Sequence, residues 1–321
     1  MPIVRARYAL ALVVAVATAC TRDDGPREEV RIGYFPNVTH APALIAAARS
    51  RTGDGVYERR LGRKVAWYPF KAGPSAAEAL LAGSLDATFI GPNPAINAFL
   101  RAKGRGVRVI AGATRGGAAL VGRRGGPTDA AGFRGLKVGT PQFGNTQDVS
   151  ARAWFMDAGL NVTQSGGDVT ILPTENASLL ALFKKGEIDG AWTVEPWVSR
   201  LELEGDGVVV HSEDDALTTV LVCSARFLEE RPADAKALVE AHREILAWMA
   251  ERRDDARETT RLELERETRG PVPSALMERC WPRLRFGAEI ELAPFAEFAE
   301  RARRCGFLPG PAQLEGLVRT P

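Results

Sequence analysis

The chain has 321 residues, of which 45% are hydrophobic and 26% are charged, a balance typical of folded proteins and not of disordered ones. Its 42 lysine and arginine residues nearly equal its 40 aspartate and glutamate residues. This balance leaves no basic excess of the kind that nucleic-acid-binding proteins carry, so we expect no nucleic-acid partner. A chain of this length can form one large domain or two medium-sized ones, each with its own core.

The first twenty residues indicate export. Arg5 and Arg7 precede an apolar stretch of about ten residues, too short to cross a bilayer as a helix but suited to a signal peptide. Small residues then lead to Cys20, as in a bacterial lipoprotein. We expect residues 1–19 to be a lipoprotein signal peptide, Cys20 to carry the lipid anchor and residues 20–29 to form a polar tether. Ordinary cleavage near Ala19, which would give a soluble secreted protein, is the alternative.

After the tether, short apolar segments alternate with amphipathic helical patterns, which favours an α/β fold with parallel strands. In the first part we expect strands at 30–34, 65–70, 87–90 and 107–111, separated by helices at 41–49, 75–83 and 93–104. Further along we expect strands at 137–139, 190–192 and 218–223, followed by helices at 233–253 and 289–304. Ser75 with Glu78 forms a capping box, and Asn93 with Pro94 is typical of a helix start.

Part of this pattern occurs twice. Residues 79–87 resemble residues 182–190: in both, a helix ends at a glycine, and an aliphatic residue followed by aspartate leads into a buried strand. We interpret the two copies as equivalent elements of two similar lobes, although two generic segments could also match by coincidence. The predicted fold is therefore α/β and two-lobed, with a hinge and a central ligand cleft. Lobe one is expected to comprise 30–115 plus 222–321, and lobe two 118–215.

Ligands of open parallel sheets bind beyond the carboxyl ends of the strands. Four such loops supply the candidate ligand-binding residues. They are Tyr34, Pro36, Asn37 and His40; Gly91, Pro92 and Asn93; Gly144, Asn145, Thr146 and Gln147; and Glu195 with Trp197. The loop 144–147 is the most informative, because its residue types let a helix begin with exposed N–H groups, which favour an anion. The alternative is that these residues only cap a helix.

Aromatic residues gather in the same loops and are expected to form an apolar pocket wall. They are Tyr34, Phe35, Phe143, Trp192 and Trp197. Glu195 has several possible roles: it could accept hydrogen bonds from an amine on the ligand, or hold Trp197 or the hinge in place. His40 could equally serve a capping or hydrogen-bonding role.

Three cysteines remain after Cys20. In an oxidising compartment Cys280 and Cys305 could pair, which would leave Cys223 free in an apolar strand. The sequence leaves this connectivity open.

Several motifs stand in order along the chain: IGYFPNVTHAP at 32–42, AGPS at 72–75, GPNPAIN at 91–97, GNTQDV at 144–149 and EPW at 195–197. Together they resemble the nitrate/sulfonate/taurine class of ABC-transporter substrate-binding proteins, close to the aliphatic-sulfonate-binding branch. The resemblance implies the type II periplasmic-binding-protein fold, ligand contacts from these loops and from the Thr218-Thr219 step, with Thr219 as the candidate ligand contact, and a permease and an ATPase as partners. The cysteine-rich run of the family's thiamine-precursor branch is absent here.

We find no paired-carboxylate site, metal-ligand spacing or nucleophile elbow, and we therefore expect a binding protein without catalytic residues, metal ion or cofactor. The predicted function is extracytoplasmic capture of a small anion, such as an aliphatic sulfonate, taurine or nitrate, by hinge closure in a monomeric, lipid-anchored protein. The alternatives are a binding protein for a heterocyclic vitamin precursor, an enzyme on the same fold and a tethered sensor.

Overall fold

The computed structural model describes residues 28–164 and 166–321. The predicted signal peptide, the lipidation site at Cys20 and most of the tether lie outside the described residues.

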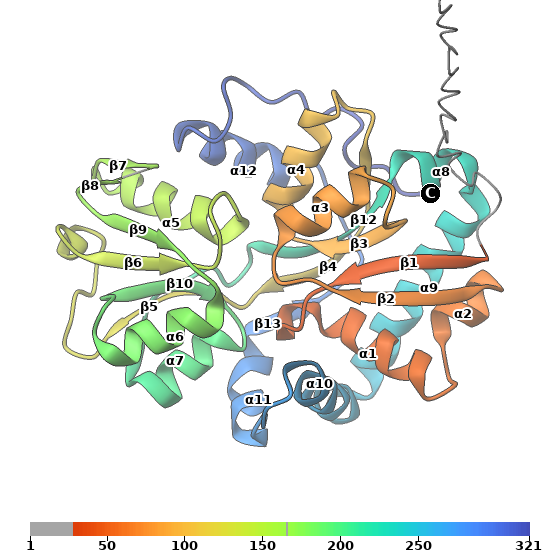
Figure 1. The fold of residues 1–321 in the computed structure, drawn as a ribbon, viewed down its shortest axis with the longest axis horizontal. Helices are drawn as coiled ribbons and strands as arrows, with labels where there is room; N and C mark the ends of the chain where they lie inside the picture. Colours follow the sequence, from red (N-terminus) through yellow and green to blue (C-terminus); the bar gives the residue numbers. More distant parts are fainter. Residues whose placement is uncertain (1–27, 165) are drawn as a thin grey trace, which may run out of the picture.

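Two mixed β-sheets lie side by side, and helices cover both faces of each (Figure 1). The strands of the first sheet, in the order β13-β4-β12-β3-β1-β2, are β1 (Glu29–Tyr34), β2 (Lys64–Pro69), β3 (Ala87–Ile90), β4 (Val107–Gly116), β12 (Leu217–Ser224) and β13 (Leu284–Phe286). Those of the second, in the order β11-β5-β10-β6-β9, are β5 (Ala118–Arg123), β6 (Lys137–Thr140), β9 (Thr170–Pro173), β10 (Gly190–Val194) and β11 (Gly207–Ser212). We call the first sheet with its helices lobe one and the second lobe two, and the two-lobed α/β prediction is confirmed.

The two sheets have the same internal topology. In lobe one β1 is parallel to β2 and β3, whereas β12 is antiparallel to both β3 and β4. In lobe two β6 is parallel to β9 and β10, and β5 is antiparallel to β10 and β11. The expectation of parallel strands is thus wrong for β12 and the short β13 in lobe one, and for β5 in lobe two. Strands β5 and β12 each enter directly from a strand of the other lobe without a crossover helix, which a parallel neighbour would need.

The sequence repeat corresponds to repeated structure. Asp86 Oδ2 accepts a hydrogen bond of 2.9 Å from the backbone N–H of Arg31, and Asp189 Oδ2 accepts one of the same length from Lys137. The backbone N–H of each aspartate donates back to the carbonyl oxygen of the same partner, at 3.0 and 2.8 Å. Each aspartate therefore joins the start of its strand, β3 or β10, to the start of the parallel neighbour, β1 or β6.

The helices pack against both faces of the sheets and enclose four buried apolar clusters, two in each lobe. The helices of lobe one are η1 (Val38–His40), α1 (Ala41–Arg51), α2 (Val56–Leu61), α3 (Gly73–Leu81), α4 (Pro92–Arg101), α8 (Ala225–Glu230), α9 (Pro232–Glu251) and α10 (Arg253–Thr268). Those of lobe two are η2 (Ala131–Phe133), α5 (Thr146–Asp157), α6 (Asn176–Lys185) and α7 (Trp197–Gly205), beside a small hairpin of β7 (Val162–Thr163) and β8 (Gly166–Gly167).

The C-terminal region contacts both lobes. Helix α11 (Ser274–Cys280), followed by η3 (Trp281–Arg283), packs against α10 of lobe one and α7 of lobe two. Helix α12 (Ala293–Arg304) packs against α4 of lobe one and α5 of lobe two. In Figure 1 these two contacts lie on opposite sides of the junction between the sheets.

The three described cysteines are buried and unpaired. The Cys280 thiol lies 3.2 Å from Glu195 Oε2, whereas Cys305 Sγ lies 3.8 Å from the carbonyl oxygen of Val149. The disulfide that the sequence left open is therefore not formed, and Cys223 is indeed buried in β12. Within the described ranges, no helix is both long enough and apolar enough to cross a bilayer.

Candidate anion-binding cleft

A cavity of about 40 Å³ lies where the two lobes meet. Its walls come from the loops that follow β1, β2 and β3 in lobe one and β6 and β9 in lobe two, together with single residues of β10 and β12. These are carboxyl ends of parallel strands, where ligands bind in open α/β sheets. The predicted site residues that line the cavity are Asn37, His40, Gly91, Asn145, Thr146 and Gln147.

The loops of the two lobes touch beside this cavity. Asn93 Nδ2 donates a hydrogen bond of 2.6 Å to the carbonyl oxygen of Gly144, and the Asn93 N–H lies 3.4 Å from Thr146 Oγ1. At Gly91 an added Cβ would lie only 2.3 Å from Thr146 Oγ1. The glycine therefore permits an approach between the lobes that any larger residue would obstruct.

Four helices from both lobes begin at the cavity. The residues that line it include Gly73 at the start of α3, Gly91 at the N-cap of α4, Thr146 at the start of α5 and Asn176 at the start of α6. A helix N-terminus carries a partial positive charge and unpaired N–H groups. The backbone of both lobes thus makes the cavity favourable for negative charge.

Helix α5 shows how the N–H groups are distributed. The side chain of Asn145 caps the helix, because its Oδ1 accepts a hydrogen bond of 2.8 Å from the Asp148 N–H. The N–H groups of Thr146 and Gln147 belong to the first turn and meet no acceptor within the part of the chain that the structure describes. The cap therefore pairs one N–H group of the first turn, that of Asp148, and leaves the N–H groups of Thr146 and Gln147 free to bind a ligand.

His40 and Asn37 add side-chain donors. The Phe35 N–H lies 3.3 Å from His40 Nδ1, so Nδ1 is the acceptor, and complete burial lowers the pKa of His40 to about 3. The ring is therefore neutral at pH 7 with its proton on Nε2. Asn37 Oδ1 accepts a hydrogen bond of 3.3 Å from Trp197 Nε1, which can only donate, and this leaves the NH₂ group of Asn37 available.

The described side chains that line the cavity carry positive charge and no negative charge. Among the described residues, Lys71 is the only side chain lining the cavity that is charged at pH 7, since His40 is neutral. The ammonium of Lys71 pairs with Glu175 at 3.0 Å across the mouth of the cleft. About 10–15 Å³ holds one water-sized group, so the cavity accommodates about three of them. This size and these donors suit a compact anionic head group.

A much larger open groove, of about 1010 Å³, adjoins the cavity. Phe35, Asn37 and Lys71 line both spaces, and Pro36 and Trp197 line the groove alone. The predicted aromatic wall is thus present in part.

Other predicted site residues lie outside the cavity lining: Tyr34, Pro92, Asn93, Gly144, Glu195 and Thr219. Tyr34 points into the core of lobe one and packs edge-on against Trp67. On β12 it is Thr218 that lines the cavity, because successive side chains of a strand point to opposite faces. Trp192, expected in the pocket wall, is buried in lobe two against Trp154.

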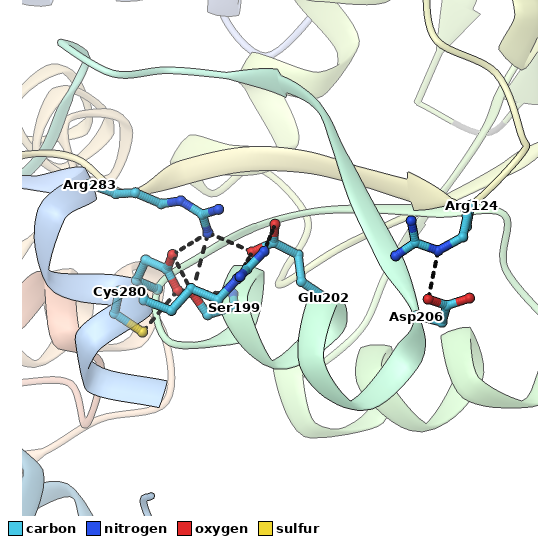
Figure 2. A network of polar contacts seen from close by, with 8 residues as sticks. Arg124, Ser199, Glu202, Asp206, Cys280 and Arg283 are labelled. Carbon is cyan, nitrogen blue, oxygen red and sulfur yellow. Dashed lines mark hydrogen bonds and ion pairs between the residues drawn. The ribbon is translucent and has the colours of Figure 1, made fainter. Parts of the chain in front are cut away.

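Glu195 does not line the cavity; its carboxylate belongs to a polar network with Ser199, Cys280 and Arg283, the last two in the C-terminal region (Figure 2). Its fully buried carboxylate accepts hydrogen bonds from Arg283 Nη1 at 2.8 Å and from Ser199 Oγ at 2.9 Å, and from the Cys280 thiol at 3.2 Å. Arg283 also pairs with Glu202 at 2.8 Å. The interpretation of Glu195 as a direct ligand contact is therefore replaced by one in which it joins lobe two to the C-terminal chain.

Sequence reasoning did not select three other polar residues that line the cavity: Thr39, Lys71 and Asn176. Asn176 could have been found by the same rule as the others, because it begins the helix that follows strand β9. That strand was not among the predicted ones. No cluster of three or more potential metal-binding side chains occurs among residues 28–164 and 166–321.

Two α/β lobes of equal strand topology, with a cavity between the ends of their parallel strands, define a periplasmic-binding-protein fold. The chain belongs to the NMT1-like family, whose model matches residues 23–263. The expected resemblance to the sulfonate- and nitrate-binding class is confirmed by relatives of known name.

An alkanesulfonate-binding protein, SsuA of Xanthomonas axonopodis pv. citri solved with MOPS bound, has a TM-score of 0.75 at 20% identity, covering 92% of this chain and 99% of that one. The periplasmic nitrate-binding protein NrtA of Synechocystis PCC 6803 has a TM-score of 0.77 at 18% identity, covering 91% and 86%. A curated protein of Escherichia coli (strain K12), named as aliphatic sulfonates-binding, is 28% identical over 203 residues. That alignment spans 62% of this chain and 59% of the relative's length.

Proposed function

We propose that the protein is the exported substrate-binding component of an ABC importer and captures a small organic anion of the sulfonate, taurine or nitrate type. The observation that carries this proposal is the interlobe cavity, in which helix N-termini and unpaired donors from both lobes converge without a lining carboxylate. The names of the sulfonate-binding and nitrate-binding relatives support the same class of ligand.

Binding and closure are coupled in this proposal. The ligand's charged oxygens accept hydrogen bonds from the Thr146 and Gln147 N–H groups of lobe two and from the His40 and Asn37 side chains of lobe one. Because these donors belong to different lobes, only the closed form satisfies all of them, and the ligand shifts the equilibrium towards closure. A permease with its ATPase then recognises the closed surface.

The cellular setting is part of the proposal. We expect a monomer held at the cell envelope by a lipid on Cys20, and we assign the protein no enzymatic activity. Replacing Cys20 with Ala should release the protein from the membrane fraction, and continued membrane association would argue against the anchor.

The substitution Asn37→Asp tests the sign of the ligand charge. Aspartate keeps an oxygen for the Trp197 Nε1–H but replaces the NH₂ donor with a negative charge beside the bound anion. The affinity for ethanesulfonate, measured by titration calorimetry, should fall at least about 100-fold, since a lost donor and a like charge together cost about 3 kcal/mol. Asn97→Asp is the matched control, because Asn97 lies one turn further along α4 than Asn93 and does not line the cavity; the affinity of this variant should stay within about twofold.

Two results would contradict the proposal. One is unchanged affinity in Asn37→Asp, which would remove the cavity as the anion site. The other is the absence of binding to ethanesulfonate, taurine and nitrate alike by the folded parent protein, which would remove the ligand class.

A further inference from the structure

We infer that Arg152 is a positioning residue for the anion, although it does not line the cavity. It holds and neutralises Asp148, the buried carboxylate that fixes the turn presenting the N–H groups of residues 146 and 147. The inference rests on the proposed function, because it places the anion at that turn. It explains how a site for an anion tolerates a carboxylate in the first turn of its own helix.

Asp148 ties the anion-binding turn to the strand before it. Its side chain is fully buried, and its Oδ1 accepts a hydrogen bond of 2.8 Å from Thr140 Oγ1 at the end of β6. Its Oδ2 accepts one of 2.9 Å from the N–H of Gly144, where the backbone turns with a φ of 69°. One carboxylate therefore holds the strand end, the turn and the first residues of α5, and this fixes the direction of the neighbouring N–H groups.

The same carboxylate opposes the binding of an anion. Asp148 is the third residue of α5, where its negative charge offsets the positive end of the helix dipole. Its side chain is 0% exposed, so solvent screens this charge little. Like charges that lie close together in a buried site repel each other strongly. A site built on this turn therefore needs a cation that neutralises Asp148 from outside the cavity.

Arg152 supplies that cation from one turn further along α5. Its Nε donates a hydrogen bond of 3.2 Å to Asp148 Oδ2, and its Nη1 donates to the carbonyl oxygen of Thr163. Its Cζ lies 5.9 Å from the ring centroid of Phe143 and 5.7 Å from that of Phe307, which packs against the core of lobe one. The Arg152 side chain is only 1% exposed, so its charge acts on Asp148 and is hardly shared with water.

The test removes the charge of Arg152 and then the charge that it neutralises. Arg152→Met should lower the affinity for ethanesulfonate at least about tenfold in titration calorimetry, because Asp148 then repels the anion. In the double variant with Asp148→Asn, affinity should return to within about threefold of the parent. Asparagine keeps an oxygen for the Gly144 N–H, and the Thr140 hydroxyl can accept from its NH₂ group instead of donating. A residue that only packs would not be rescued, since both variants lack the guanidinium.

Two further variants separate charge from shape. Arg152→Lys keeps the charge without the planar fork and should bind within about threefold of the parent. Arg231→Met is the matched control, because Arg231 also pairs with a nearby carboxylate, that of Asp234 at 2.7 Å, and its Cζ lies 4.9 Å from the ring centroid of Phe227. That pair lies where α8 meets α9 in lobe one, outside the cavity lining, so the affinity should stay within about twofold. Circular dichroism shows whether each variant is folded.

The inference is overturned if folded Arg152→Met binds as tightly as the parent, or if the double variant binds no more tightly than Arg152→Met. Where Arg152→Met does not fold, a tenfold loss of affinity in Arg152→Lys or in the double variant overturns it. A double variant that also fails to fold would show that Arg152 serves the fold alone. A folded parent protein that binds neither ethanesulfonate, taurine nor nitrate would instead overturn the proposed function, and the inference with it.

Discussion

Removing the guanidinium of Arg283 should destabilise the protein far more than removing that of Arg285 two residues later. Arg283 is 29% exposed and pairs with two carboxylates, Glu195 at 0% exposure and Glu202 at 8%. Arg285 is 66% exposed and pairs with Asp215, which is 74% exposed. The two arginines thus form ion pairs of similar length in opposite environments.

The size of the expected loss in stability follows from the two buried carboxylates that lose Arg283 in the substitution Arg283→Met. Breaking a buried ion pair on one side costs about 3–5 kcal/mol, because the other charge stays buried without compensation. Glu195 keeps its hydrogen bonds from Ser199 and Cys280, and Glu202 keeps Arg279 at 2.8 Å, so we expect the lower end, about 3 kcal/mol. Arg285→Met should cost about 0–1 kcal/mol.

The assay is urea denaturation at pH 7 followed by circular dichroism, with the free energy of unfolding taken from linear extrapolation. Burial tends to raise the pKa of Glu202, but the hydrogen bonds from Arg279 and Arg283 lower it overall. In Arg283→Met that pKa should rise, so the variant should recover part of its stability relative to the parent at lower pH. Adding Glu195→Gln to Arg283→Met should also recover part of the loss, because it removes the uncompensated charge.

The reasoning would be refuted if Arg283→Met and Arg285→Met lowered the free energy of unfolding by amounts within about 1 kcal/mol of each other. It would also be refuted if Glu195→Gln deepened the loss in the double variant. Affinity for the ligand should stay within about threefold in all these variants, since Glu195, Arg283 and Arg285 do not line the cavity.

Three further predictions concern the cleft and the buried histidines. Gly91→Ala should lower ligand affinity about tenfold in titration calorimetry, because its Cβ would meet Thr146 Oγ1 at 2.3 Å and overpacking of this kind costs about 1–3 kcal/mol. Asn145→Ala should lower the free energy of unfolding by about 1 kcal/mol in urea denaturation, because it removes the N-cap of α5. Burial lowers the pKa of His40 to about 3 and that of His242 to about 4, whereas both would titrate near pH 6.5 in the unfolded chain. The unfolded state therefore binds more protons below about pH 6.5, and stability should fall from pH 7 to pH 5, by up to about 1.4 kcal/mol per pH unit for each histidine.

Each of these predictions has a contrary result. Gly310→Ala, where the added Cβ has open space, should leave affinity unchanged, and an equal effect of Gly91→Ala and Gly310→Ala would argue against a close approach of the lobes. Unchanged stability in Asn145→Ala would mean that the cap contributes nothing. A pH dependence as steep in His242→Gln as in the parent would mean that His242 is not buried in its neutral form.

Local sequence signals located most of the elements that position the site. The strand expected at 30–34 is β1 (Glu29–Tyr34), and the helix expected at 93–104 is α4 (Pro92–Arg101). Both combine an apolar core pattern with a glycine, proline or capping residue at the end, so pattern and boundary agree. The repeat around Asp86 and Asp189 was visible because the same backbone contact requires the same residue in each lobe.

The direction in which a side chain points, and its partners far along the chain, could not be predicted from local sequence signals. Thr218 and Thr219 are neighbours on one strand, and only the pairing of β12 with β3 and β4 decides which of them faces the cavity. Glu195 has its cation, Arg283, 88 residues later in the chain, and no local pattern connects the two. Strand β13 has only three residues, too few for a periodicity to be recognised.

Helix α12 divides its two faces between the lobes. Its apolar residues Phe295, Phe298 and Ala302 belong to the core of lobe one, whereas Arg304, 37% exposed, pairs at 2.5 Å with Asp157 of lobe two, which is 54% exposed. Apolar contacts are costly to expose, but exposed ion pairs exchange readily for water. When the cleft opens to admit or release a ligand, α12 should therefore travel with lobe one as a fixed part of it and separate from lobe two along a surface that water can rewet.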